Sequence, residues 1–424
     1  MLTVTTVVLM AAASAPSPIY PLYRRRWDFS VTLLTVVFAV YVVGLLGALL
    51  LLGPVSDRLG RRPVLLAALL LATASTAIFW TAGGVLSLVV ARTVQGLATG
   101  TAVGALAAGL VDLSPSQRPH AGTTVTAVGT SVGLAASAAV VGLLVESVAH
   151  PDTCVFPVLT CVFLLLTVAV WYIPETAAPA PDAPPRFRPS VRVPPGSRHR
   201  FLAAVPALVA GWSVTGLFLA LTPSVVTGVL HVRRGAAGGM DIAALFLAGG
   251  LGGMWSARHT VRRATLLGGA LLTLGSAGLA VAITLPSPYV YACGAVVAGL
   301  GVGLTYNGNL RAIGEVTTAQ SRSGVFSAVY VVSYAALSLP ALAAGFLTPV
   351  WGLRTTSLVY VAFVGSLSLI TLVHAAGSPA GGHVHRGTST VPTGRTAATK
   401  RTKRADVCHS PSGGDGPTSG SRGH

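Results

Sequence analysis

Charged residues are scarce in this chain. Only 9% of the 424 residues are charged and just 11 are Asp or Glu, whereas 52% are hydrophobic. The mean hydropathy is +0.73. A soluble domain carries roughly a quarter charged residues. The scarcity therefore excludes an ordinary soluble protein and indicates one that lies within a lipid bilayer.

The chain also has few cysteines and none of the common catalytic motifs. Its cysteines show no paired spacing and no CxxC, so they indicate neither a disulfide framework nor a metal site; they are Cys154, Cys161, Cys293 and Cys408. No Walker-type glycine loop, nucleophile elbow or metal-ligand cluster is found. We therefore expect no cofactor, no metal, no enzymatic activity and no use of ATP.

Twelve apolar runs make up most of the chain. A helix needs roughly 20 apolar residues to cross a hydrocarbon core of about 30 Å, and a helix satisfies all its backbone groups internally where water is absent. The runs lie near residues 2–22, 30–52, 64–83, 86–108, 122–146, 154–173, 202–226, 241–257, 264–285, 288–310, 323–347 and 355–376. The predicted fold class is an all-α membrane protein with twelve transmembrane helices.

Positive charge is concentrated in alternate loops. If the N-terminus is cytoplasmic, 21 of the 28 Lys and Arg residues fall on that side and six on the other. Because Lys and Arg near helix ends are retained in the cytoplasm, this pattern predicts a plasma-membrane protein with both termini inside. Arg24 to Arg26 do not fit this rule, because the predicted topology places them on the outer side. Either later helices override the orientation that the first helix would take, or the true start lies upstream. The net charge of +17 thus reflects topology and predicts no nucleic-acid partner.

A segment rich in Pro and Arg divides the runs into two sets of six. It predicts a six-helix half at 1–173, a cytoplasmic linker at 174–200 and a second half at 201–376. Residues 377–424 contain too little apolar surface to fold, so we expect a disordered basic tail. Its cluster at 400–404 either contacts anionic lipid or is simply solvated.

The two halves repeat each other in sequence. Arg92, Gly96, Gly100 and Gly104 lie four residues apart in the fourth run, and an offset of 203 gives Ala295, Gly299, Gly303 and Asn307 in the tenth. Parallel six-helix repeats place a substrate site between them near the bilayer midplane, where rocking of the halves gives alternating access. The repeat therefore predicts a transporter.

A polar hinge joins the second and third runs. It reads from Gly53 to Arg62 and contains the motif residues Gly53, Asp57, Arg58, Gly60, Arg61 and Arg62. A carboxylate at a helix end pairs with arginines and complements a helix N-terminus, so Asp57 is predicted to act as a latch in gating. The alternative is that the arginines only anchor the loop in the cytoplasm.

Arg92 is the one strongly basic residue inside an apolar run. A charge at the bilayer centre costs about 2.5 to 3.5 kcal/mol on insertion scales, so Arg92 is expected to face the protein interior. We predict that it bonds to backbone carbonyls or to a substrate anion, close to Gln95 and Gly96. The alternative is that its side chain snorkels to the outer surface.

Other polar and aromatic residues are candidates for the substrate cavity. They are Thr130 in the fifth run, Trp212 in the seventh, Asn307 in the tenth, and Tyr330 and Tyr334 in the eleventh. Aromatic rings stack on apolar ligands. Ordinary helix packing explains the hydroxyl residues equally well, and Trp212 also fits an interfacial belt.

These motifs resemble those of the major facilitator superfamily. Residues 53–62 are similar to its G-x-x-x-D-R-x-G-R-R signature, residues 88–100 to its fourth-helix motif, and residues 173–176 to the P-E-T that closes the sixth helix. The resemblance covers positions 1 to about 376. It implies a twelve-helix secondary transporter of the bacterial drug or small-solute permease type. The fifth run lacks the G-P ending of the family's antiporters.

The leading hypothesis is proton-coupled efflux of drug-like compounds by a monomer. Metabolite uptake by the same fold and a transport-inactive ligand sensor are the alternatives. No span has a central acid; the acids in loops or near helix ends are Asp28, Asp112, Glu146, Asp241 and Glu315. Coupling therefore runs through Arg92 with a mobile anion, or through Glu146 or Asp241 at the rim, or the transport is not proton-driven.

Overall fold

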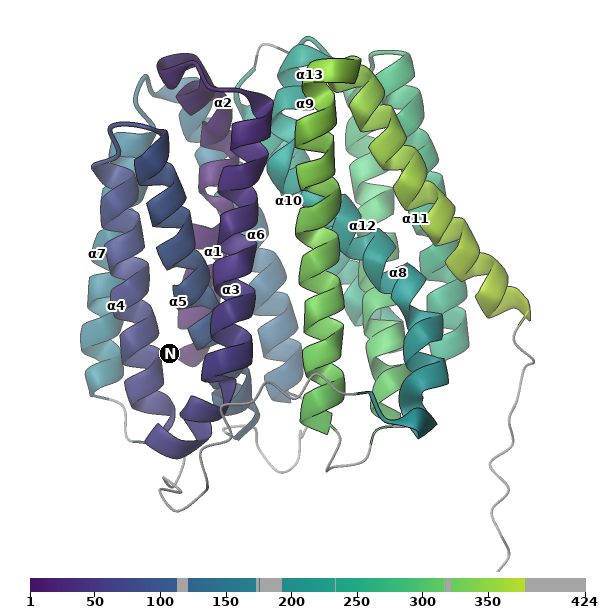
Figure 1. Ribbon diagram of the computed structural model, residues 1–424, viewed down its shortest axis with the longest axis horizontal. Helices are drawn as coiled ribbons and strands as arrows, with labels where there is room; N and C mark the ends of the chain where they lie inside the picture. The colour runs from purple at the N-terminus through teal and green to yellow at the C-terminus, as the bar shows by residue number, and fades with distance from the viewer. Residues whose placement is uncertain are drawn as a thin grey trace, which may run out of the picture. The chain divides into compact units, whose positions relative to one another are not determined.

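The computed structural model describes residues 1–112, 121–172, 175, 193–232, 234–315, 317 and 322–377, without the side chains of 52–58, 111–112, 121, 123 and 322–323. Within these ranges every regular element is an α-helix (Figure 1). The helices are α1 (Leu2–Ser14), α2 (Pro16–Trp27), α3 (Val31–Leu59), α4 (Arg61–Trp80), α5 (Val85–Asp112), α6 (Ala121–Ser147), α7 (Asp152–Trp171), α8 (Pro195–Ala220), α9 (Thr222–Gly228), α10 (Ala236–Ser256), α11 (Val261–Thr284), α12 (Pro288–Glu315) and α13 (Arg322–Gly377).

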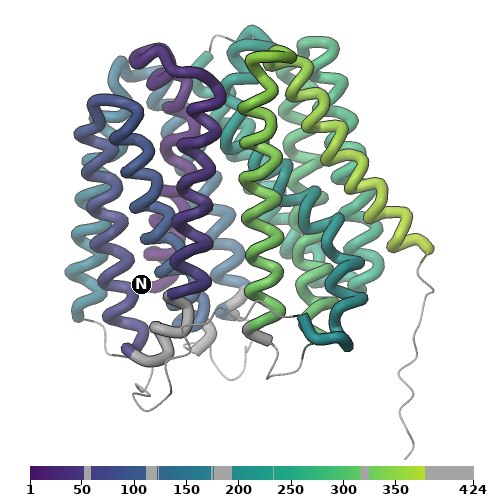
Figure 2. Tube along the Cα trace, in the orientation of Figure 1, coloured from purple at the N-terminus to yellow at the C-terminus, as the bar shows by residue number. Residues whose placement is uncertain are grey.

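Twelve spans result when the last helix is divided. In the described residues, eleven helical segments are long and apolar enough to cross a membrane, and the last has 54 residues. At 1.5 Å per residue it would reach about 80 Å, far more than a bilayer core. Gly352 breaks it with φ 77°, and Figure 2 shows the chain turning back on itself there. The predicted twelve-helix fold is confirmed.

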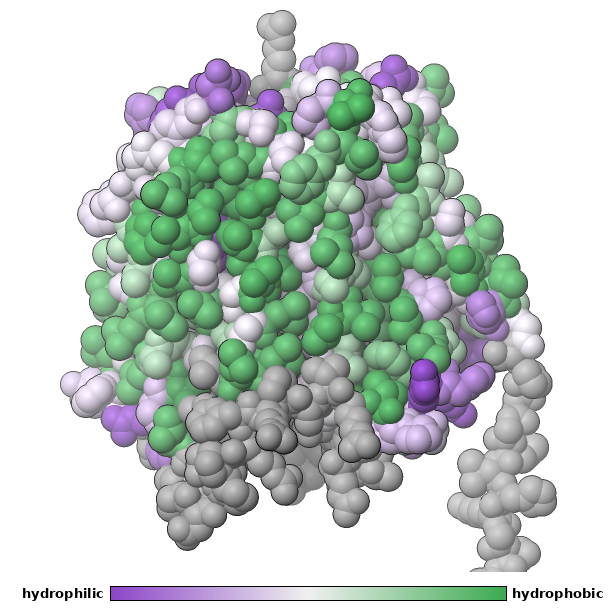
Figure 3. Space-filling view, in the orientation of Figure 1, coloured by the Kyte–Doolittle hydropathy of each residue, from purple (hydrophilic) through white to green (hydrophobic). Residues whose placement is uncertain are grey.

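Side chains on the bundle surface match this arrangement. Figure 3 shows hydrophobic side chains spread over the flank of the bundle, with hydrophilic ones gathered toward its ends. Large apolar residues such as Leu86, Leu165 and Val350 are more than two-thirds exposed there. Exposed apolar side chains are unfavourable in water but not in lipid, so this surface is consistent with a position in the bilayer. We call the two ends of the bundle the Met1 end and the Asp28 end.

The two halves use the same helix pairings. In the first, α5 lies between α3 and α4; in the second, α12 lies between α10 and α11. Glycines allow both central helices to approach closely: a Cβ on Gly96 or Gly100 would strike backbone of α3, and one on Gly299 or Gly303 would strike backbone of α10. The glycines aligned by the sequence repeat therefore occupy the same packing position in both halves.

The halves are joined mainly by two helix pairs, α3 with α13 and α6 with α10, and α2 also contacts α9 and α10. Thr32 Oγ1 donates a 2.7 Å hydrogen bond to the carbonyl of Gly345. On the other side, Gly239 packs on the backbone of α6 at Ala138 and Gly142. These contacts lie in the parts of the helices nearer the Asp28 end, so the halves meet closely there.

Some boundaries differ from those expected. Helix α8 begins at Pro195 and α10 at Ala236, both earlier than their apolar runs. The reason is that helices extend beyond the apolar stretch, where polar and glycine residues still form backbone hydrogen bonds. Most of the predicted linker and the tail from residue 378 lie outside the described residues.

Candidate functional site

The polar hinge between the second and third spans is almost entirely helical. Helix α3 continues to Leu59 and α4 begins at Arg61, so a single residue, Gly60, with φ 89° and ψ 164°, separates them. The expected loop over 53–62 is therefore wrong in its secondary structure. The side chains of Asp57 and Arg58, and the surroundings of Gly53, lie outside the described part of the chain.

Glu175 caps the first turn of α4. Its Oε1 accepts a 2.9 Å hydrogen bond from the backbone N–H of Arg61, and its Oε2 accepts one of 3.0 Å from that of Arg62. These N–H groups have no partner inside the helix, and a carboxylate complements the positive end of the helix dipole. A Cβ on Gly60 would lie 2.5 Å from Glu175 Oε2. Glycine at this position thus leaves room for the cap.

In each half, an arginine at the start of one helix bonds to the end of another helix of the same half. Arg62 donates from Nη2 to the carbonyl of Trp171, and its guanidinium lies 5.5 Å from the centre of the Trp171 ring. In the second half, Arg262 donates to the carbonyls of Ala375 and Ala376 at 3.3 and 3.1 Å. Both arginines satisfy carbonyls left free at the end of a helix.

Arg92 is fully buried in α5, which excludes snorkelling to the surface. Its Nε donates to the hydroxyl of Tyr20 at 2.6 Å, and its Nη1 donates to the carbonyl of Ala13 at 3.0 Å and to Gln95 Oε1 at 2.7 Å. A backbone carbonyl, one of the two expected partners, is therefore present. Gln95 in turn donates to the carbonyl of Ala12 at 2.8 Å.

Proline explains why the carbonyl of Ala12 is available. In a continuous helix it would accept from the N–H four residues later, but that residue is Pro16, which has no N–H. The position of Pro16 in the first apolar run is thus a sequence signal for a free carbonyl, although it does not say which side chain uses it.

The charge of Arg92 is stabilised by dipoles and aromatic faces. The guanidinium carbon lies 5.3 to 5.9 Å from the ring centres of Tyr20, Tyr41 and Phe79, distances at which a cation is attracted to the ring. No carboxylate forms an ion pair with it within the described residues, and its Nη2 has no hydrogen-bond partner there. Arg92 is thus a cation held without an anion.

An aromatic cluster brings together three helices of the second half. The ring of Trp212 in α8 lies 5.9 Å from Tyr306 in α12 and 5.0 Å from Tyr334 in α13, and Tyr330 lies 6.3 Å from Tyr334. We call these four residues the aromatic cluster. All four are half-buried. Tyr306 is not among the main candidates from the sequence, because only the helix packing brings it to the others.

The aromatic cluster adjoins the contact between the halves. Trp212 and Tyr334 pack against a hydrophobic core that includes Tyr41 of α3. Tyr41 also lies under the Arg92 guanidinium. Tyr41 is also within electrostatic range of Tyr334, so it lies close to both candidate groups, one in each half.

The remaining residues predicted for the substrate cavity do not all lie near Arg92 or the aromatic cluster. Asn307 donates a 3.0 Å hydrogen bond to the carbonyl of Gly303 in its own helix and lies near Gly253. Gly96 faces the backbone of α3, so it serves helix packing. Thr130 is half-buried in α6, outside the aromatic cluster.

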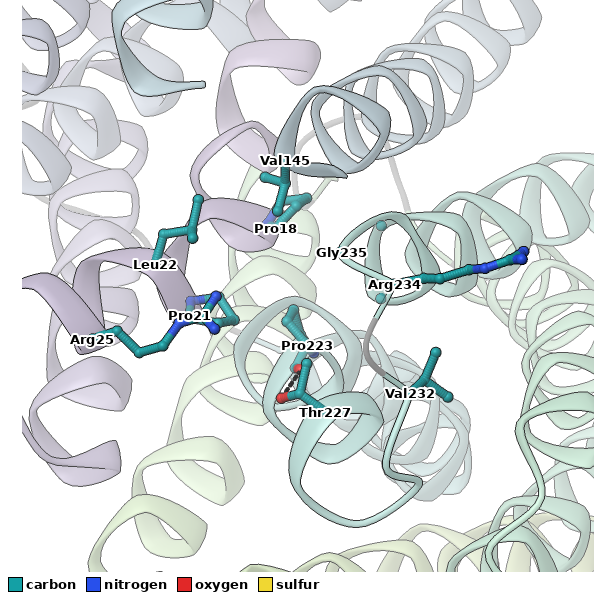
Figure 4. Close-up of a pocket in the computed structure, with 12 residues that line it drawn as sticks. Pro18, Pro21, Leu22, Arg25, Val145, Pro223, Thr227, Val232, Arg234 and Gly235 are labelled. Carbon is teal, nitrogen blue, oxygen red and sulfur yellow. Dashed lines mark hydrogen bonds between the residues drawn. The ribbon is translucent and has the colours of Figure 1, made fainter. Parts of the chain in front are cut away.

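A cavity of about 420 Å³ lies at the Asp28 end. Figure 4 shows walls from both halves, with Pro18, Leu22 and Val145 on one side and Pro223 and Thr227 on the other. The cavity therefore opens at the contact between the halves, where relative movement would change its size.

The family model described as Major Facilitator Superfamily matches residues 2–339. The chain belongs to this superfamily. Its members are transporters rather than enzymes, so the protein is a multi-pass membrane transporter of the secondary type. No protein of curated function matches the chain.

Solved structures share the fold of this superfamily member. One is a bacterial homolog of the human lysosomal transporter Spinster in an inward-facing, unoccupied conformation: the TM-score is 0.73 at 13% identity, over 88% of this chain and 95% of that one. The same homolog in an occupied inward-facing conformation gives 0.70, with equal identity and coverage. At this identity the likeness concerns the fold alone.

Proposed function

We propose that the protein exports drug-like organic compounds across the plasma membrane by alternating access, in exchange for protons. The observation that carries this proposal is the aromatic cluster of Trp212, Tyr306, Tyr330 and Tyr334 beside the contact between the halves. In a transporter built from two six-helix repeats, the substrate binds between them. A group of rings at that position is suited to bind it.

The chemistry of the cluster favours planar apolar compounds, including those with a delocalised positive charge. Aromatic faces stack on flat rings and attract cations. Within the described residues, none of the three tyrosine hydroxyls has a hydrogen-bond partner, so they are available to a ligand. A sugar or phosphate would instead require a larger set of polar and charged groups.

The Met1 end is the cytoplasmic end in this proposal. The arginines at the starts of α4 and α11, Arg61, Arg62, Arg262 and Arg263, lie at that end together with the chain start. Positive residues are retained in the cytoplasm, so both termini face inward. One chain contains both halves of the pathway, and we propose that it works as a monomer.

The test is transport of ethidium, a planar aromatic cation, by the purified full-length protein in liposomes with an imposed pH gradient. We expect gradient-dependent movement of ethidium. Trp212→Ala should remove most of it, because the central ring of the cluster is lost. Trp80→Ala is the matched control, since Trp80 is 52% exposed at the end of α4 and should keep full activity.

Three other results would replace the proposal. Flux that ignores the pH gradient would rule out proton exchange. Accumulation of metabolites but no dye would favour an uptake permease. Saturable ethidium binding without any flux would favour a ligand sensor.

A further inference from the structure

One carboxyl group is buried among the side chains that the structure describes. Asp241 in α10 is only 8% exposed. The other acids whose side chains the structure describes are exposed or paired: Asp28, Glu146, Glu175 and Glu315 are exposed, and Asp152 forms a 2.7 Å ion pair with Arg26. Among the described acids, Asp241 is therefore exceptional.

The depth of Asp241 follows from where α10 begins. The helix starts at Ala236, and each residue adds about 1.5 Å along the axis. Asp241 thus lies more than one turn inside the helix. The sequence places Asp241 at the rim of its span, and the structure adds that the side chain is buried there.

No cation compensates Asp241 in the part of the chain that the structure describes, which omits Arg233. The helices packed against α10 are α2, α6, α8, α9, α11 and α12. Tyr291 of α12 is a titratable group within electrostatic range of Asp241, and its hydroxyl is already 2.8 Å from Thr222 Oγ1. No described cation lies within ion-pair distance of Asp241.

Of the other titratable groups on or beside these helices, Arg25 of α2 and Arg234 line the cavity at the Asp28 end, and neither forms an ion pair with Asp241. Helix α6 has the exposed Glu146, and α9 has none. Tyr20, Tyr23 and Arg24 to Arg26 belong to α2, and His231 and Arg234 precede α10 with exposed side chains. The basic residues of α8 and α11 are at the opposite, Met1 end: Arg198, His199, Arg200, Arg262 and Arg263.

Helix α10 borders the contact between the two halves close to Asp241. Gly239, two residues before it, packs on α6 at Ala138 and Gly142. Gly238 and Gly239 line the 420 Å³ cavity at the Asp28 end. Asp241 follows Gly238 by three residues, so the two lie on the same side of α10, and the acid is about one helical turn from a residue that lines a space between the halves.

We propose that Asp241 is the proton-binding site of the transport cycle, an inference that rests on the proposed exchange of protons. A buried carboxylate without a cation is strongly destabilised, and such a group neutralises instead. In the closed arrangement, a protonated Asp241 is packed inside the second half, where Tyr291 of α12 is within electrostatic range. When the halves separate at the Asp28 end, water reaches the carboxyl group and the proton exchanges with that side.

The first test separates coupling from transport in proteoliposomes loaded with ethidium. Asp241→Asn should lose the response to a pH gradient but keep ethidium exchange at equal pH, while Asp241→Glu should keep both. Glu315→Gln, an exposed acid at the end of α12, is the control. A gradient response that survives in Asp241→Asn, or is lost in Glu146→Gln instead, would overturn the proposal. So would transport driven by a sodium gradient at equal pH.

The second test does not depend on transport or on any variant. Dicyclohexylcarbodiimide, an apolar reagent, modifies protonated carboxyl groups in apolar surroundings, and mass spectrometry locates the modified peptide. In the wild-type protein in liposomes, we expect modification of Asp241 that decreases as the pH rises. Absence of modification, or modification independent of pH, would contradict proton binding at Asp241. Absence of any ethidium movement by the wild type would refute only the proposed function.

Discussion

The Nε of Arg92 donates a 2.6 Å hydrogen bond to the hydroxyl of Tyr20, which lies 72 residues earlier in the chain. Both side chains are at most 1% exposed. The bond therefore joins α5 to the first span in the interior of the bundle, and it partly compensates a charge that no carboxylate neutralises in the described residues.

Removing the Tyr20 hydroxyl tests this bond directly. Tyr20→Phe leaves the ring under the guanidinium but removes the acceptor, so a buried charged donor becomes unsatisfied. The expected loss in unfolding free energy is about 1 to 3 kcal/mol, measured as a lower thermal unfolding midpoint in detergent. Tyr172→Phe, at a site 81% exposed, should leave the midpoint unchanged. Equal midpoints for both variants would show that the bond contributes nothing.

Replacing Arg92 tests its part in transport. We expect Arg92→Ala to abolish ethidium flux in liposomes, because Arg92 bonds to Ala13 in the first span and lies over the ring of Tyr41 in α3. The variant should still insert in the membrane and remain monodisperse. Arg354→Ala, at an exposed position near the Asp28 end, is the control. Unchanged flux in Arg92→Ala would count against a role in the cycle.

A methyl group at Gly60 should disrupt the cap on α4. Gly60 has φ 89° and ψ 164°, a conformation that is essentially restricted to glycine, and its Cβ would lie 2.5 Å from Glu175. We expect Gly60→Ala to lower stability by about 1 to 3 kcal/mol, measured by thermal unfolding. Gly83→Ala is the control, since a Cβ there meets nothing within 4 Å. Similar midpoints for the two variants would refute the explanation.

The predicted latch at Asp57 is tested by kinetics. Asp57→Asn keeps the shape of the side chain but removes its charge, and we expect it to slow turnover more than it weakens ethidium binding. Flux at saturating ethidium and binding at equilibrium provide the two measurements. If binding weakens and turnover is preserved, the residues around Asp57 only anchor the loop.

Local composition was sufficient to predict the membrane spans. Crossing a hydrocarbon core needs a helix of about 20 apolar residues, so each span is recognisable without knowing its neighbours. The last helix confirms this, because Gly352 divides 54 residues into the two spans that the sequence predicts. The repeat was also readable, since the glycines at Gly96 and Gly299 serve the same close approach of helices.

Only the tertiary structure decided which distant residues meet. Glu175 caps the helix that begins at Arg61, and Trp212 joins Tyr306 and Tyr334 from two other helices. Such contacts depend on how helices rotate and pack against each other, which apolar composition does not specify. The burial of Asp241 depends on the start of α10 and on the neighbours around that turn. The sequence by itself thus determined a twelve-span transporter, and packing decided where its polar groups can act.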